Sequence, residues 1–126
     1  MSIIASVAVG VAAVIHVVIF VLESIRWMHP TTWRVFGIRG REQAEVLRPM
    51  AYNQGFYNLF LALGAFAGIL LFWTGSPRAG LALALFTTAC MAAAAVVLTT
   101  TGRGYLRAAV AQGLVPLVAF VLLLFT

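Results

Sequence analysis

Residues 53–73 read NQGFYNLFLALGAFAGILLFW, and the stretch passes from three amide side chains into an apolar segment. A helix needs roughly 20 mainly apolar residues to cross the ~30 Å hydrocarbon layer of a membrane. Working outward from this segment, the chain offers three others of similar length and character. We therefore predict membrane spans over residues 3–23, 52–73, 79–99 and 105–125.

The composition agrees with a membrane protein. Hydrophobic residues make up 63% of the 126 residues and charged residues only 9%, whereas about a quarter of the residues of a soluble protein are charged. The chain is short enough for one domain, and the breaks near residues 74–77 and 101–104 are short. We expect an all-α, integral membrane up-down-up-down four-helix bundle that occupies residues 1–126.

The basic residues predict an orientation. All eight are Arg, and with three Glu they give a formal net charge of +5. One side of the predicted bundle carries Arg26, Arg34, Arg39, Arg41, Arg48, Arg103 and Arg107, and the other side carries Arg78. Since positive charge favours cytoplasmic loops, we predict a multi-pass protein of the inner (cytoplasmic) membrane with both termini outside. The Arg residues flank apolar segments and form no basic stripe, so we expect no nucleic-acid partner.

The first connection, residues 28–50, is too long and too amphipathic for a plain turn. We expect a short helix capped by Thr31 or Thr32, Glu–Arg pairs at helical spacing, and a kink or a helix start at Pro49. We predict that this amphipathic interfacial segment lies on the membrane surface, over the cytoplasmic mouth of the bundle.

Two ionisable residues lie in the first span. An ionisable residue in a membrane helix costs a few kcal/mol on insertion scales, so it is a functional candidate. His16 and Glu23 are seven residues apart, which places them on nearly the same helix face, ~10 Å apart along the axis.

Amides gather at a similar depth in two other spans. Gln54 and Asn58 lie one turn apart, Asn53 and Tyr57 lie on the adjacent face, and Gln112 lies two turns into the fourth span. Unpaired buried amides cost roughly 1–3 kcal/mol each, so these groups face each other, water or a ligand. A hydrogen-bond network that joins the helices and a ligand pocket both remain open. For the pocket we predict the catalytic pair His16 and Glu23 and the ligand-binding residues Asn53, Gln54, Tyr57, Asn58 and Gln112.

Three strings of residues carry a resemblance to a known family. They are His16-x-x-x-Phe20-x-x-Glu23-x-x-x-Trp27, then Asn53-Gln54-Gly55-x-Tyr57-Asn58-x-Phe60-Leu61-Ala62, then Gln112-Gly113-x-x-Pro116. Together they resemble the "domain of unknown function 1304" family, small bacterial membrane proteins with four predicted helices. The resemblance covers nearly the whole chain and implies a fold, but no activity.

Three classes of function fit these observations. The first is an intramembrane enzyme that acts on a small lipophilic ligand by acid–base chemistry, such as isomerisation or epoxide opening. The second is a proton-coupled small-molecule transporter. The third is a cofactor protein, in which haem bound through His16 stays open although no cofactor or metal site is evident. The spacing Gly64-x-x-x-Gly68 allows close helix packing, either inside the bundle or in a homo-oligomer.

Overall fold

The computed structural model describes residues 1–126, apart from the side chain of Arg103. Its elements in chain order are α1 (Ile3–Phe20), the π-helical turn η1 (Val21–Ile25), α2 (Pro30–Phe36), α3 (Arg41–Trp73), α4 (Pro77–Thr100), the 3₁₀ turn η2 (Arg103–Tyr105) and α5 (Leu106–Leu124). Four segments are long and apolar enough to cross a membrane: α1 continued by η1, α3, α4 and α5.

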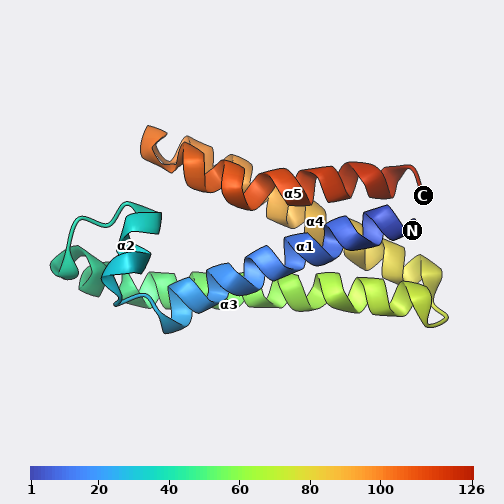
Figure 1. Ribbon diagram of the computed structural model, residues 1–126, viewed down its shortest axis with the longest axis horizontal. Coiled ribbons are helices and arrows are strands. Elements are labelled where there is room, and N and C mark those ends of the chain that lie inside the picture. The colour runs from blue at the N-terminus through green and yellow to red at the C-terminus, as the bar shows by residue number, and fades with distance from the viewer.

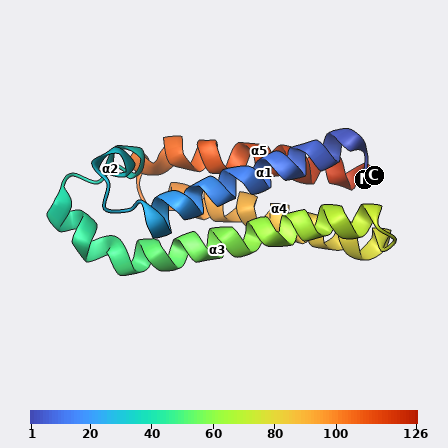
Figure 2. The ribbon, with the colours of Figure 1, turned by 60° about the horizontal axis from the view of Figure 1, so that its bottom comes forward.

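These four segments form the predicted bundle. α1 packs against α3 and α5, and α4 packs against the same two helices on the other side. Consecutive long helices run in opposite directions, so both termini lie at one end of the bundle and α2 lies at the other (Figures 1 and 2). The all-α, up-down-up-down prediction is confirmed.

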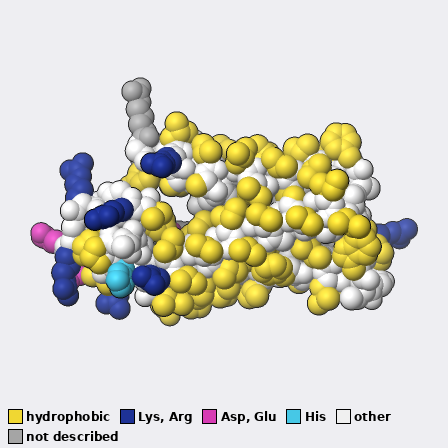
Figure 3. Space-filling model, viewed as in Figure 1, with side chains coloured by type: hydrophobic (Ala, Val, Ile, Leu, Met, Phe, Trp, Pro, Cys, Tyr) yellow, Lys and Arg dark blue, Asp and Glu magenta, His cyan; other side chains and the backbone are white. Residues whose placement is uncertain are grey.

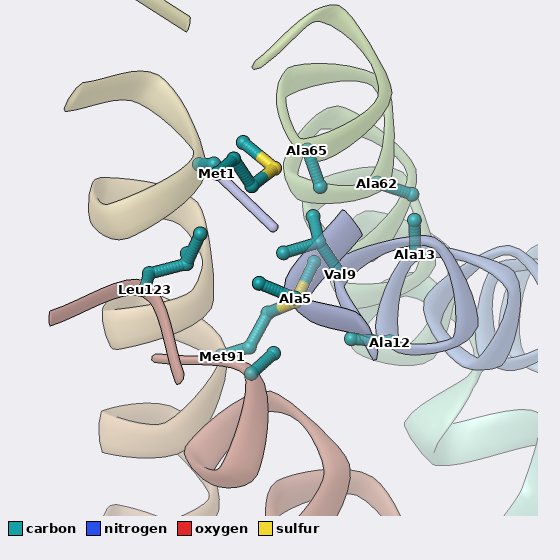
Figure 4. Close-up of a cluster of buried hydrophobic side chains, with 11 residues drawn as sticks. Met1, Ala5, Val9, Ala12, Ala13, Ala62, Ala65, Met91 and Leu123 are labelled. Carbon is teal, nitrogen blue, oxygen red and sulfur yellow. The ribbon is translucent and has the colours of Figure 1, made fainter. Parts of the chain in front are cut away.

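The bundle interior is built from small side chains. Seven alanines are buried in its core cluster: Ala5, Ala12, Ala13, Ala62, Ala65, Ala84 and Ala119. Only a few larger residues, among them Val9, Met91 and Leu123, fill the space between them (Figure 4). Large apolar side chains such as Phe60 and Leu70 instead point outward. Because lipid solvates these outer side chains, close packing of small residues remains to hold the helices together.

Gly64 and Gly68 of α3 pack against α4 inside the bundle. A Cβ atom added at Gly68 would lie 2.9 Å from the backbone nitrogen of Ala84, and one added at Gly64 would lie 2.7 Å from Cγ2 of Thr87. On α4, a Cβ atom at Gly80 would lie 2.6 Å from the carbonyl oxygen of Gly68. The backbones of α3 and α4 therefore meet directly at the Gly64-x-x-x-Gly68 motif.

The start of α2 corrects one prediction. Neither Thr31 nor Thr32 caps the helix, because α2 already begins at Pro30, with His29 in the N-cap position and no side-chain cap. Proline suits the first helical position, since its fixed φ angle is already helical. Thr32 is only 1% exposed, and its hydroxyl has no hydrogen-bond partner in the part of the chain that the structure describes.

α3 begins earlier than the apolar pattern indicates. It starts at Arg41, continues through Pro49 and spans 33 residues, or roughly 50 Å at 1.5 Å per residue. This length exceeds the ~30 Å of hydrocarbon, so the first turns extend beyond the apolar layer. Arg41 there donates to Glu45 at 2.8 Å, one of the predicted Glu–Arg pairs. The first turns bend away from the line of the remaining helix (Figure 2), as expected for an interior proline.

Charge is distributed unequally between the two ends. Arg side chains gather around α2, while apolar side chains cover the flanks of the bundle (Figure 3). The opposite end has Arg78 in the first turn of α4. The structure thus has an apolar belt with an Arg-rich end and an Arg-poor end.

Candidate functional site

A cavity of about 490 Å³ lies between the helices at the α2 end of the bundle. Four of the predicted site residues line it: Glu23 from η1, Gln54 and Asn58 from α3, and Gln112 from α5. The facing wall is apolar and comes from α4, with Ala94, Val97 and Leu98. The volume falls within the roughly 300–1,000 Å³ typical of small-molecule sites.

Glu23 and Asn58 are joined across the cavity wall. Nδ2 of Asn58 donates to Oε2 of Glu23 at 3.0 Å and to the backbone carbonyl of Gln54 at 3.0 Å. Both N–H groups of the amide can thus be used, which fixes the side chain. Within the described chain, Oε1 of Glu23 receives no hydrogen bond, so this oxygen can accept one from a ligand.

The π-helical turn places Glu23 in this wall. The N–H of Arg26 donates to the carbonyl of Val21 at 2.8 Å, a bond that spans five residues and widens the last turn after α1. π-Helix occurs mostly as single turns inside α-helices, and such turns are frequent at functional sites. In a regular α-helix Glu23 would lie on nearly the same face as His16. The wider turn rotates Glu23 away from that face.

The amides of Gln54 and Gln112 have no protein partner. Among the described side chains, neither amide donates to or accepts from another group, and Gln54 is exposed whereas Gln112 is half-buried. Pro116 lies inside α5 and has no N–H, so the carbonyl of Gln112 also lacks its usual helix donor. A network of amides that only joins the helices would pair these groups with one another. Here they line open space instead.

Aromatic residues close the cavity toward α2. Trp27, Phe36 and Tyr105 line it, and the rings of Trp27 and Phe36 lie 5.5 Å apart. The indole of Trp27 donates to the carbonyl of Ala44 at 2.8 Å, and the indole of Trp33 donates to the carbonyl of Trp27 at 2.7 Å. These bonds fasten the segment containing α2 to the first turns of α3.

His16 lies outside the cavity lining. Its side chain is 2% exposed, and its Nδ1 lies 2.9 Å from the carbonyl of Ala12 on the same helix. A ring enclosed to this degree could reach a haem iron only if the surrounding helices separated. The structure therefore does not bring His16 to the cavity that Glu23 lines.

Asn53 and Tyr57 face outward from α3. Asn53 is exposed, and Tyr57 is 57% exposed. Asn53 lies 20 residues before Trp73, the last residue of α3, which corresponds to ~30 Å of helix. With Trp73 at one edge of a ~30 Å hydrocarbon layer, Asn53 would lie at the other edge, where water and headgroups can satisfy its amide. This position accounts for one of the three amides in the opening stretch without any ligand.

Several lining residues were not among the predicted site residues. Trp27, Phe36, Tyr105 and the apolar residues of α4 complete the cavity. Trp27 could have been chosen, because an indole near a membrane interface that also needs a hydrogen-bond partner is a candidate for a fixed position. The α4 residues carry no such signal, since apolar residues occur throughout that helix.

Comparison with known proteins identifies a family for the chain. No curated protein and no solved structure matches it. The family described as "Protein of unknown function (DUF1304)" matches residues 10–124, which include α3, α4, α5, the larger part of α1 and every residue that lines the cavity. This chain is a member of the DUF1304 family.

Proposed function

We propose that this protein binds a small lipophilic or amphipathic molecule in the cavity lined by Glu23, Gln54, Asn58 and Gln112. The observation that carries the proposal is the fixed Glu23–Asn58 pair beside unpaired amides. A carboxylate oxygen from η1 and the amides of Gln54 from α3 and Gln112 from α5 suit a polar group of the ligand. The apolar wall of α4 suits its hydrocarbon body.

The free oxygen of Glu23 favours proton transfer as the chemistry of this site. For a ligand with a β,γ-unsaturated carbonyl group, the Glu23 carboxylate would remove a proton from the carbon between the carbonyl group and the double bond, and the electron pair would move onto the carbonyl oxygen to give a dienolate. Amide N–H groups of Gln54 or Gln112 would stabilise the resulting oxyanion. Return of the same proton to the γ carbon would shift the double bond next to the carbonyl group and complete an isomerisation without any other reactant.

The ligand would enter from the bilayer or from the Arg-rich side. Gln112, Phe36 and Ala108 line both the cavity and an apolar groove on the outer surface between α1 and α5. The cavity and that groove therefore adjoin at these side chains, which would give a lipophilic molecule dissolved in the membrane a route toward Glu23.

The test is a native mass spectrum of the gently purified protein, recorded with two matched variants. Asn58→Leu removes the amide that holds Glu23. Asn53→Leu makes the same change on an exposed position of the same helix. We expect a stoichiometric adduct in the wild-type protein and in Asn53→Leu, and its loss in Asn58→Leu. Equal adduct in both variants, or a bare wild-type protein, would contradict a retained ligand in this cavity.

A further inference from the structure

A second hollow, outside the proposed ligand cavity, combines two Arg residues with apolar side chains. It has a volume of about 460 Å³ and lies between α2 and the start of α5. Arg34 from α2 and Arg107 from the first turn of α5 both line it, together with Tyr105. The described lining residues include no carboxylate. The neighbouring hollow around Trp33 differs, because its Arg41 is paired with Glu45 at 2.8 Å.

The floor of this hollow continues into the membrane. A narrower hollow of about 210 Å³ runs between α1 and α5. The two share Val35, Phe36, Ala108 and Ala111, so they form one continuous groove, which we call the α1–α5 groove.

The lower part of the α1–α5 groove follows a line of aliphatic side chains on α1 and η1. Val14 and Val18 of α1 and Leu22 of η1 line it at intervals of four residues, which corresponds to ~12 Å of helix. Val14 and Val18 are about half exposed, at 54% and 51%. The groove thus has a cationic head at the Arg-rich end and an apolar tail along the span.

We propose that the α1–α5 groove holds one anionic phospholipid, with its phosphate between Arg34 and Arg107 and one acyl chain along α1. Guanidinium groups bind phosphate through paired hydrogen bonds. Basic hollows between membrane helices are typical headgroup sites for anionic lipids. Two Arg residues without a carboxylate among the described lining residues favour an anionic amphiphile over a zwitterionic one.

The bound lipid would complete the wall of the neighbouring cavity. Phe36 and Ala108 line both the groove and the cavity, so a lipid in the groove would hold α2 against α5 from outside. This site is separate from the proposed ligand cavity and does not depend on Glu23 or Asn58.

The experiment is a lipid titration followed by native mass spectrometry. Delipidated protein in detergent receives phosphatidylglycerol or phosphatidylcholine with the same acyl chains. We expect one phosphatidylglycerol per chain, bound at least roughly tenfold more tightly than phosphatidylcholine. The double variant Arg34→Gln with Arg107→Gln should lose this preference. Equal binding of the two lipids to the wild-type protein would overturn the proposal.

A matched double variant separates the site from general surface charge. Arg41→Gln with Arg48→Gln removes the same charge from the same end of the molecule, at residues that line the neighbouring hollow. We expect it to keep the preference for phosphatidylglycerol. Equal loss in both double variants would show that surface charge alone attracts the lipid, and would overturn the proposed site.

A third variant tests the acyl-chain part of the groove. Ala111→Phe keeps every charge but fills the floor that the two hollows share, so it should weaken phosphatidylglycerol binding. Inorganic phosphate at the same concentration should not displace the lipid. Unchanged lipid binding by Ala111→Phe, or displacement by phosphate, would indicate an anion site without a seat for the acyl chain and would overturn the proposal. The variants in the lipid experiments leave Glu23 and Asn58 unchanged. The outcome for lipid binding is therefore independent of whether Asn58→Leu loses the cavity adduct.

Discussion

The hydroxyl of Ser24 lies over Gly55, where it donates a hydrogen bond to the backbone carbonyl of Tyr52 at 2.8 Å. A Cβ atom at Gly55 would clash with this hydroxyl and would lie 3.1 Å from Cβ of Glu23. Gly55 therefore sets the distance between η1 and α3, and with it the geometry of the Glu23–Asn58 hydrogen bond.

Gly55→Ala should push η1 away from α3. We expect a loss of about 1–3 kcal/mol of stability, the usual cost of overpacking, together with loss of the cavity adduct. Thermal unfolding in detergent and native mass spectrometry measure the two effects. Adding Ser24→Gly removes the obstructing side chain and should recover part of the stability. An additive double variant would show that the contact between Ser24 and Gly55 does not cause the loss.

Gly80→Ala should be among the most damaging glycine substitutions. Its new Cβ would meet backbone atoms of α3 at Gly68 and Phe72, and backbone cannot rotate away. We expect a cost at the upper end of the roughly 1–3 kcal/mol range, or above it. Gly10→Ala is the control, because its Cβ would lie 3.9 Å from Ile69 and alanine favours a helix by about 1 kcal/mol. Equal unfolding temperatures for the two variants would contradict direct backbone contact between α3 and α4.

Ala94→Phe should block the cavity while leaving the fold intact. Ala94 lines the cavity, whereas its neighbour Ala93 lines an apolar hollow between α4 and α5. We expect Ala94→Phe to lose the adduct and Ala93→Phe to retain it, with similar unfolding temperatures. Adduct in Ala94→Phe at the wild-type level would place the ligand elsewhere.

Glu23→Gln and His16→Leu should behave differently. Gln at position 23 can still accept the hydrogen bond from Asn58, but an uncharged NH₂ donor then replaces the free carboxylate oxygen that faces the ligand, so we expect weaker ligand binding by roughly tenfold. His16→Leu removes a buried side chain that bonds only to its own helix, so we expect unchanged ligand content. Adduct titration measures both. Loss of the ligand in His16→Leu with Glu23→Gln unaffected would assign the chemistry to His16 instead.

The Arg-rich end should face the cytoplasm. The expectation rests on the unequal distribution of Arg between the two ends and places both termini on the opposite side. A reporter enzyme that is active only in the cytoplasm, fused after Thr126, should be inactive. Fusion within the segment after α2, at Gly40, should give activity. An active C-terminal fusion would reverse the orientation.

The sequence predicted the bundle and part of the site, for identifiable reasons. Apolar runs of sufficient length define the four spans, and the amides of Gln54, Asn58 and Gln112 interrupt those runs at a similar depth. Helical periodicity could not predict that η1 widens its turn and shifts Glu23 relative to His16. It also could not separate Asn53 from Gln54, because these two exposed neighbours on α3 differ only in that Gln54 lines the cavity.

The interior of this bundle is built from small residues, whereas large hydrophobic residues usually form the core of a protein. In this bundle the bulky positions face lipid, where one aliphatic residue replaces another with little change in packing. The alanines and glycines face neighbouring helices, where even a single added methyl group has nowhere to go. The small residues therefore determine how the helices pack. A search for distant relatives that gives most weight to large hydrophobic residues would miss these positions.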